Sequence, residues 1–311
     1  MPTHRLAVRE YLRGGPGLAP DDLTSVFLMR EDDDTAPRPL PTLTVGEVPE
    51  AMESLMAVGI KSVKVFAGSR VRDTSASQSA SPTGLMARTI RAAKEAAPNV
   101  AVMTETCVCS HTASGECWLP RIGCPEVDLE ATIDVLASQA VMQADAGADI
   151  VGPAAMIPGS VRAVRQALDA SGHGDVAIMP HLIFESGLYE GYRSTMGAAP
   201  RSGARVFQVN PRHPEVAVHI AQQMVAEGAD MLLTEPALHT VDTLVALKQK
   251  VSVPIVPFSV SGEYLRLTDL RENGERDVKG LMEAYTVLKR SGAHRIITYG
   301  AVEIAQVLRS S

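Results

Sequence analysis

Three cysteines lie close together and form the strongest chemical signal in the sequence. They are Cys107, Cys109 and Cys117, in the segment TETCVCSHTASGECW. Thiolates are preferred zinc ligands, and three protein ligands with an open fourth position are typical of a catalytic rather than a structural site. Zinc with an open position can polarise a carbonyl group or activate water. The spacing therefore predicts a metal site, and three reduced cysteines in a loop are the alternative.

A fourth cysteine, Cys124, either closes this site or has no part in it. Four cysteines in 311 residues are too few for a disulfide scaffold. The chain carries 36 acidic and 29 basic residues, and a net charge of −7 argues against a nucleic-acid partner. Apolar runs are only as long as a strand, and the N-terminus lacks the apolar region of a secretory signal. We therefore expect a cytoplasmic globular protein with no membrane partner.

Strand-like and helix-like segments alternate along the chain, and this alternation predicts the fold. The strand-like segments begin near Leu23, Ser62, Val100, Asp149, Val176, Asp230, Pro254 and Arg295. Helix-length connections between strands that are apolar on both faces are typical of a buried parallel sheet. Eight such units predict an α/β protein, a (β/α)8 TIM barrel with its chemistry at the carboxyl ends of the strands. A doubly wound open sheet is the alternative, but no glycine-rich phosphate loop follows an early strand.

The chain is expected to divide into an N-terminal arm, 1–22, and a barrel domain, 23–311. The arm is polar and rich in Arg, Gly and Pro, so it is expected either to fray or to dock on a neighbouring subunit. Residues 74–84 follow the second predicted strand and form a candidate mobile lid. Residues 206–210 (VFQVN) are an additional extended piece between the fifth and sixth units.

The cysteine segment and the sequence after it resemble the porphobilinogen synthase (5-aminolevulinate dehydratase) family. The likeness covers nearly the whole chain and continues in order through GSVRAVRQALDASG, AIMPH, SGLYEGYR, FQVNP, EGADMLLTEPAL, VSGEY and ITYGA. The resemblance implies a (β/α)8 barrel with an N-terminal arm that wraps a neighbour, and a homo-oligomer from dimer to octamer. It also implies a lyase that condenses two molecules of 5-aminolevulinate into porphobilinogen.

The resemblance fails at the two lysines that form Schiff bases with substrate in this family. Aligned on the family's motifs, these positions are Ile183 and Glu235. Only a primary amine forms an iminium with a ketone, so neither residue can replace lysine. Lys64, inside the second predicted strand, is the one candidate replacement, but the alternation of side chains does not tell which way it points. We therefore expect an enzyme that works without a lysine Schiff base.

Other functional positions implied by the resemblance are retained. Cys107, Cys109 and Cys117 match the zinc ligands of the family. The residues that match the groups holding the substrate carboxylates are Arg193, Arg205, Gln208, Ser261 and Tyr299. A guanidinium suits this role because it can bind a carboxylate through two parallel hydrogen bonds. Surface salt bridges and strand-end capping are the alternatives for these residues.

Several matched positions carry different chemistry from the family. Glu105 replaces an aspartate, Ala154 a serine, and His111 and His181 tyrosines. The two histidines have either a functional role or only a structural one. A carboxylate at a barrel mouth is costly unless it is paired or solvated, so Glu235 is expected to pair with an arginine or to act as a general base with a raised pKa. The catalytic candidates are Glu235, Glu105 and Tyr299.

These inferences predict a Zn2+-dependent lyase or condensing enzyme that dehydrates or cyclises a small carboxylate-bearing amino- or keto-acid. Such a divergent relative is expected in a specialised biosynthetic pathway. The second hypothesis is an inactive paralogue that binds 5-aminolevulinate or an active synthase. Residual porphobilinogen synthesis is a third hypothesis.

Overall fold

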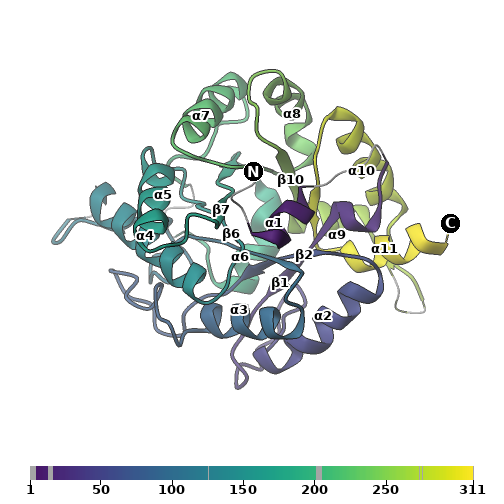
Figure 1. Ribbon diagram of the computed structural model, residues 1–311, viewed down its shortest axis with the longest axis horizontal. Coiled ribbons are helices and arrows are strands. Elements are labelled where there is room, and N and C mark those ends of the chain that lie inside the picture. Colours follow the sequence, from purple (N-terminus) through teal and green to yellow (C-terminus); the bar gives the residue numbers. More distant parts are fainter. Residues whose placement is uncertain are drawn as a thin grey trace.

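A closed sheet of parallel strands occupies the centre of the molecule (Figure 1). The computed structural model describes residues 5–12, 17–124, 126–200, 205–272, 274 and 276–310. Its strand segments are β1 (Leu23–Leu28), β2 (Ser62–Phe66), β3 (Ala101–Thr104), β6 (Ile150–Val151), β7 (Ala177–Ile178), β8 (His181–Ile183), β9 (Leu232–Glu235), β10 (Ile255–Ser259) and β13 (Ile296–Thr298). They pair in the order β7-β6-β3-β2-β1-β13-β10-β9-β8.

The two end members of this order, β7 and β8, are pieces of one strand. Only Met179 and Pro180 separate them, and proline has no N–H to donate to a sheet ladder. Since β7 pairs with β6 and β8 pairs with β9, the sheet closes on itself. The nine segments therefore make the eight strands of a barrel, and the (β/α)8 prediction is confirmed.

Helices follow the strands and form the outer ring (Figure 1). They are α2 (Val48–Ala57), α3 (Leu85–Ala96), α4 (Leu129–Asp145), α5 (Ser160–Ala170), α7 (Pro214–Ala226), α8 (Val241–Lys248), α10 (Lys279–Ser291) and α11 (Ala301–Ser310). In α5, Val161, Val164 and Leu168 are buried at helical spacing against the sheet. The Asp128 side chain accepts a hydrogen bond from the Ala131 N–H and so caps the start of α4.

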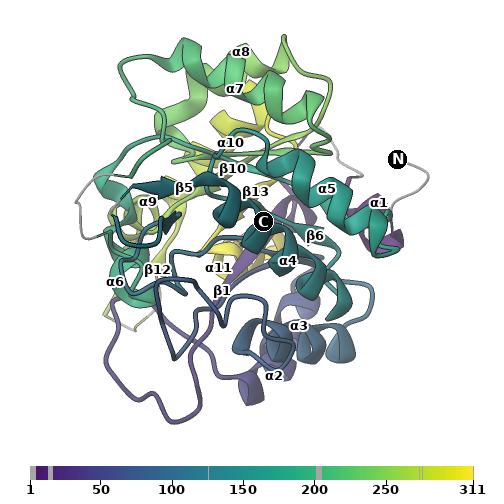
Figure 2. The same cartoon turned by 90° about the vertical axis from the view of Figure 1, so that its left-hand side faces the viewer.

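Shorter elements complete the carboxyl end of the barrel. Helices α6 (Glu190–Met196) and α9 (Ser261–Leu267) lie at the end opposite the N-terminal helix α1 (Leu6–Tyr11) (Figure 2). The minor elements are the hairpins β4 (Leu119–Pro120) with β5 (Val127–Asp128) and β11 (Asp269–Leu270) with β12 (Arg276–Asp277), and the 3-10 helices η1 (Pro20–Asp22), η2 (Val45–Glu47), η3 (Gly187–Tyr189) and η4 (Leu238–Thr240). The extended piece at 206–210 adds one bridge, between Val209 and Phe184.

The N-terminal helix α1 (Leu6–Tyr11) packs on the amino end of its own barrel. Val8 and Tyr11 are buried there, and the Arg295 guanidinium at the start of β13 donates a hydrogen bond to the Tyr11 carbonyl. Arg5 Nη1 donates to the Ala148 carbonyl at 2.8 Å. This part of the arm is therefore held in place rather than frayed, whereas docking on a neighbouring subunit stays a prediction.

Within the described ranges, no helix combines the length and the apolar character needed to cross a bilayer.

A buried ion pair joins the start of the barrel to helix α10. Lys289 Nζ in α10 lies 2.8 Å from Asp22 Oδ1, and the two side chains are 8% and 2% exposed. Removing one member of such a pair leaves an uncompensated buried charge.

We therefore predict that Lys289→Met lowers the free energy of unfolding by about 3 kcal/mol, measured by chemical denaturation. Lys61→Met, at an exposed lysine, is the matched control and should change stability by less than about 0.5 kcal/mol. Equal stabilities for the two variants would show that the Asp22 carboxylate does not depend on Lys289.

Candidate functional site

A cavity lies at the carboxyl ends of the strands and receives side chains from most of the barrel. It is lined by Phe66, Glu105, Cys107, Cys109, Cys117, Ala154, His181, Ile183, Tyr189, Tyr192, Arg193, Arg205, Gln208, Glu235, Phe258, Val260 and Tyr299. Side chains from loops after β3, β6 and β8 meet those from the ends of β2, β8, β9 and β10. Closure of the barrel therefore brings residues far apart in sequence to one site.

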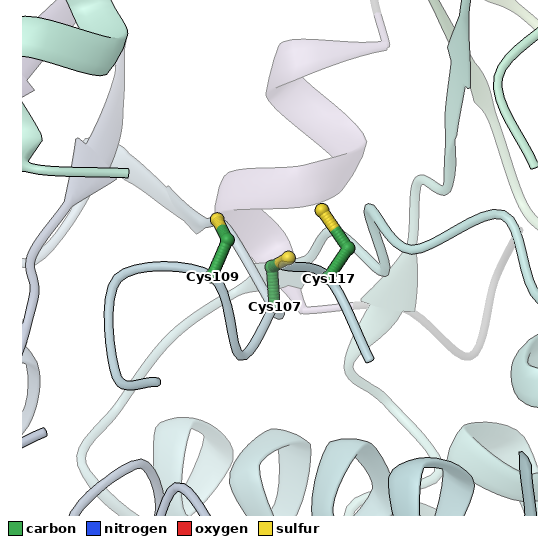
Figure 3. A group of neighbouring side chains, drawn as sticks. All are labelled: Cys107, Cys109 and Cys117. Carbon is green, nitrogen blue, oxygen red and sulfur yellow. The ribbon is translucent and has the colours of Figure 1, made fainter. Parts of the chain in front are cut away.

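The loop after β3 places three thiols beside one another (Figure 3). The sulfur atoms of Cys107, Cys109 and Cys117 all lie within 4.8 Å of one another, and all three side chains are buried. Three converging sulfurs form a donor set that suits a thiophilic divalent metal. Cys124 lies outside this group and is only partly buried.

Hydrogen bonds within the cluster prepare one sulfur to ionise. Hydrogen bonds from Cys107 and Cys109 hold the pKa of the Cys117 thiol well below its usual range. The hydrogen bond between Cys107 and Cys109 raises the pKa of the Cys107 thiol. Arg205 Nη1 also donates to Cys117 Sγ at 2.6 Å. The predicted carboxylate-binding Arg205 therefore contacts the thiol cluster in this structure.

The two acidic candidates face the cavity and are both buried. The hydroxyl of Tyr192 donates to Glu105 Oε2 at 2.8 Å, and burial raises the pKa of Glu105 to about 8. Glu235 Oε1 lies 2.9 Å from His181 Nδ1, and burial raises the pKa of Glu235 to about 7. Its partner is thus a histidine rather than an arginine. Both carboxyls can exchange protons near neutral pH.

His181 shares a cavity wall with Glu235. Burial lowers the pKa of His181 well below its usual range, so the ring is neutral. Its Nε2 atom is buried and, in the described part of the chain, has no hydrogen-bond partner. His111 is placed differently. Its Nδ1 lies 2.5 Å from Ser69 Oγ and its Nε2 lies 3.3 Å from Gln139 Nε2, away from the cavity.

Strand β2 turns Lys64 into the barrel, which settles the direction that the sequence left open. The side chain is fully buried, and its Nζ atom donates to the Thr104 carbonyl at 3.0 Å. The same nitrogen lies 5.3 Å from the centre of the Phe66 ring, which lines the cavity. Burial lowers the pKa of Lys64 to about 8, although the carboxyls of Glu105 and Glu235 partly oppose this effect.

The remaining predicted carboxylate-binding groups fall into two sets. Arg193, Gln208 and Tyr299 line the cavity, and the Tyr299 hydroxyl has no hydrogen-bond partner among the described residues. Ser261 is not in the cavity wall. Its hydroxyl donates to the Leu188 carbonyl at 3.1 Å and accepts from the Tyr192 N–H at 3.1 Å, so it links α9 to α6.

Sequence reasoning did not single out Tyr189 and Tyr192, although both line the cavity. Both belong to the motif SGLYEGYR, which supported the family resemblance. Their roles depend on tertiary contacts. Tyr192 donates to Glu105, and the Tyr189 ring lies 5.3 Å from the Arg193 guanidinium.

A closed (β/α)8 barrel with ionisable side chains in a cavity at the carboxyl ends of its strands belongs to a broad class of barrel enzymes. Comparison with known proteins narrows this class. The sequence model of the delta-aminolevulinic acid dehydratase family matches residues 16–307. The chain therefore belongs to this family, and the resemblance drawn from the sequence is confirmed.

Individual relatives agree with this assignment. The delta-aminolevulinic acid dehydratase of Escherichia coli is 36% identical over 82% of this chain and 79% of its own length. That of Bacillus subtilis is 34% identical over 83% and 80%. The Toxoplasma gondii enzyme, solved with the reaction product porphobilinogen, is 28% identical, has a TM-score of 0.87, and covers 97% of this chain and 89% of its own. Dehydratases of this kind are lyases.

The buried Glu235 carboxyl predicts how stability depends on pH. Its pKa is above the value of an unfolded glutamate, so the folded protein binds the proton more tightly, and stability falls as pH rises from about 4.5 through about 7. We predict that Glu235→Gln abolishes this fall in stability with rising pH. The difference in unfolding free energy between pH 5 and pH 8 should therefore be smaller than in the wild type by roughly 2 kcal/mol. Chemical denaturation at both pH values measures it.

Glu95→Gln is the control, because Glu95 is exposed on α3. It should leave the pH dependence of unfolding as in the wild type. A Glu235→Gln variant with the wild-type dependence would mean that this carboxyl is not buried as described.

Proposed function

We propose that this protein is a zinc-dependent lyase of the porphobilinogen synthase type, acting on a small amino- or keto-acid without an amine at the two lysine positions of its family. The observation that carries the proposal is one cavity in which three converging thiols face two buried carboxyls, while Ile183 and Glu235 occupy the lysine positions. Zinc is the metal we propose because thiolates suit it and it has no redox chemistry of its own. A homo-oligomer in the cytoplasm, working in a specialised biosynthetic pathway, is proposed with it.

The chain's own groups divide the work between binding and proton transfer. Cys107, Cys109 and Cys117 would hold the metal, which when bound would polarise a carbonyl or hydroxyl group of the substrate. Arg193, Gln208 and Tyr299 would hold substrate carboxylates, and Arg205 can join them if the metal takes over its contact with Cys117. Ser261 would support this wall by fixing the backbone of Tyr192.

Loss of water needs an acid at the departing hydroxyl and a base at the neighbouring proton. Glu235 can serve as the acid, because its raised pKa keeps a protonated fraction near neutral pH. His181 orients that carboxyl through its Nδ1 atom. Glu105, held by Tyr192, is the second group that can exchange a proton near neutral pH. Phe66 and Phe258 form part of the cavity wall and limit the access of water.

Metal content tests the thiol site. We predict that the purified wild type contains close to one zinc per chain by elemental analysis, and that Cys109→Ser reduces it at least tenfold because two sulfurs do not complete the site. Cys124→Ser is the matched control and should retain the metal. Equal zinc content in the two variants would contradict a site at Cys107, Cys109 and Cys117.

Turnover tests the reaction. The substrate named for the relatives makes 5-aminolevulinate the first compound to incubate with the zinc-loaded protein, followed by other amino-keto acids, with products detected by mass spectrometry. We predict a product formed with loss of water, and a fall of at least about a hundredfold in rate for Glu235→Gln, which keeps shape but loses the transferable proton. Tight binding of these compounds without any product would contradict the proposal and favour an inactive paralogue.

A further inference from the structure

We propose that Lys64 is the catalytic amine of this barrel and forms a Schiff base with the ketone of a keto-acid bound in the cavity. The inference rests on the keto-acid substrate of the proposed function and adds the group that captures it covalently. It departs from the sequence-based expectation of an enzyme that works without a lysine Schiff base. The amine lies on strand β2, whereas the two lysine positions of the family, 183 and 235, lie on β8 and β9.

The first support is where β2 places the nitrogen. Residues two apart in a strand point to the same side of the sheet, so Lys64 lies directly below Phe66, which lines the cavity. The Lys64 nitrogen is 5.3 Å from that ring. His181 and Glu235 line the same cavity and interact electrostatically with Lys64. The amine therefore lies immediately beneath the cavity floor.

The second support is that this amine lacks the fixed partner of a structural lysine. Lys94 and Lys289 each hold a carboxylate, at 2.9 Å and 2.8 Å. Among the described residues, Lys64 Nζ makes one hydrogen bond, to the Thr104 carbonyl, and no ion pair within 4.0 Å. An ammonium group has three donors, so this one contact leaves two of them without a partner among the described residues.

The third support is the neighbour that Lys64 shares with the cavity wall. A methyl group at Gly152 would lie 2.6 Å from the Thr104 carbonyl oxygen and 3.1 Å from both Lys64 Nζ and His181 Nε2, so glycine is required where these groups meet. His181 Nε2 is itself without a hydrogen-bond partner in the described ranges. The Lys64 amine thus lies close to an unpartnered nitrogen of a residue that lines the cavity.

Burial also gives the amine suitable reactivity. It lowers the pKa of Lys64 to about 8, so about a tenth of the amine at neutral pH is the free base that attacks a carbonyl carbon. A lysine in water would be almost wholly protonated at neutral pH. The nearby carboxyls stabilise the cationic iminium once it forms, since that group carries the same charge as the ammonium.

The step balances with the groups present. The ammonium of Lys64 first passes one proton to the Glu235 carboxylate. The free amine then adds to the ketone carbon, and a second proton moves from the nitrogen to the former carbonyl oxygen, which becomes a hydroxyl. Glu235 then returns its proton to the resulting hydroxyl, which leaves as water. The nitrogen lone pair forms the C=N bond. The net change is one ketone and one ammonium giving one protonated imine and one water, with no oxidant or reductant.

Borohydride trapping tests the assignment directly. The protein is incubated with 5-aminolevulinate, levulinate or pyruvate, treated with sodium borohydride, digested and analysed by peptide mass spectrometry. We expect a reduced adduct on Lys64, and none at that position in Lys64→Arg or Lys64→Met. Lys61→Arg is the matched control, because Lys61 is exposed and directly precedes strand β2. This variant should give the same Lys64 adduct as the wild type.

The result that overturns the inference is the absence of a Lys64 adduct with all three keto-acids across pH 6 to 9, or an adduct only on another lysine. Lys64→Arg keeps the buried charge, and its unfolding free energy separates lost chemistry from lost folding. Trapping does not need turnover, so an adduct without product supports Lys64 and contradicts the proposed function. Product formation by Lys64→Met at the wild-type rate supports the proposed function and contradicts Lys64.

Discussion

Desolvation inside the closed barrel is the constraint on which the rest of this site depends. Parallel strands bury both faces of the sheet, and ionisable groups at their carboxyl ends lose most of their water. Burial raises the pKa of Glu105 and Glu235 and lowers that of Lys64, so all three values fall near neutrality. Groups that would be fully ionised at the surface can therefore gain and lose protons at working pH. The same loss of water strengthens each contact that orients them.

The thiol cluster and the acid–base groups line one cavity. The loop after β3 supplies the sulfurs and Glu105, whereas β8 and β9 supply His181 and Glu235. In the proposed function, a metal at the thiols and these proton-exchanging groups would act on the same bound molecule. Membership of the delta-aminolevulinic acid dehydratase family accounts for the barrel. In the proposed function, the residues at positions 183 and 235 distinguish this chain from the family's lysine chemistry.

Two residues that the sequence offers as functional candidates make hydrogen bonds that join neighbouring segments of the barrel. Ser261 ties α9 to α6, and His111 joins Ser69 to Gln139. Helix α1 packs at the amino end of the barrel, opposite the end where α6 and α9 lie (Figure 2). Each uses its polar groups in contacts that a motif cannot reveal, because the partners come from distant segments.

The sequence by itself determined the barrel, the family and the three cysteines, because each is written locally: in the alternation of apolar segments, in ordered motifs, and in a short spacing. The sequence also predicts that Ile183 and Glu235 stand where the family has lysine, and this alignment stays a prediction. Only the tertiary structure decided that Lys64 points inward, that Glu235 pairs with His181, and that Ser261 faces α6 rather than the cavity. The physical reason is that a strand's alternation fixes two faces without saying which is inside. That choice, and every contact across the barrel, is made only when the sheet closes.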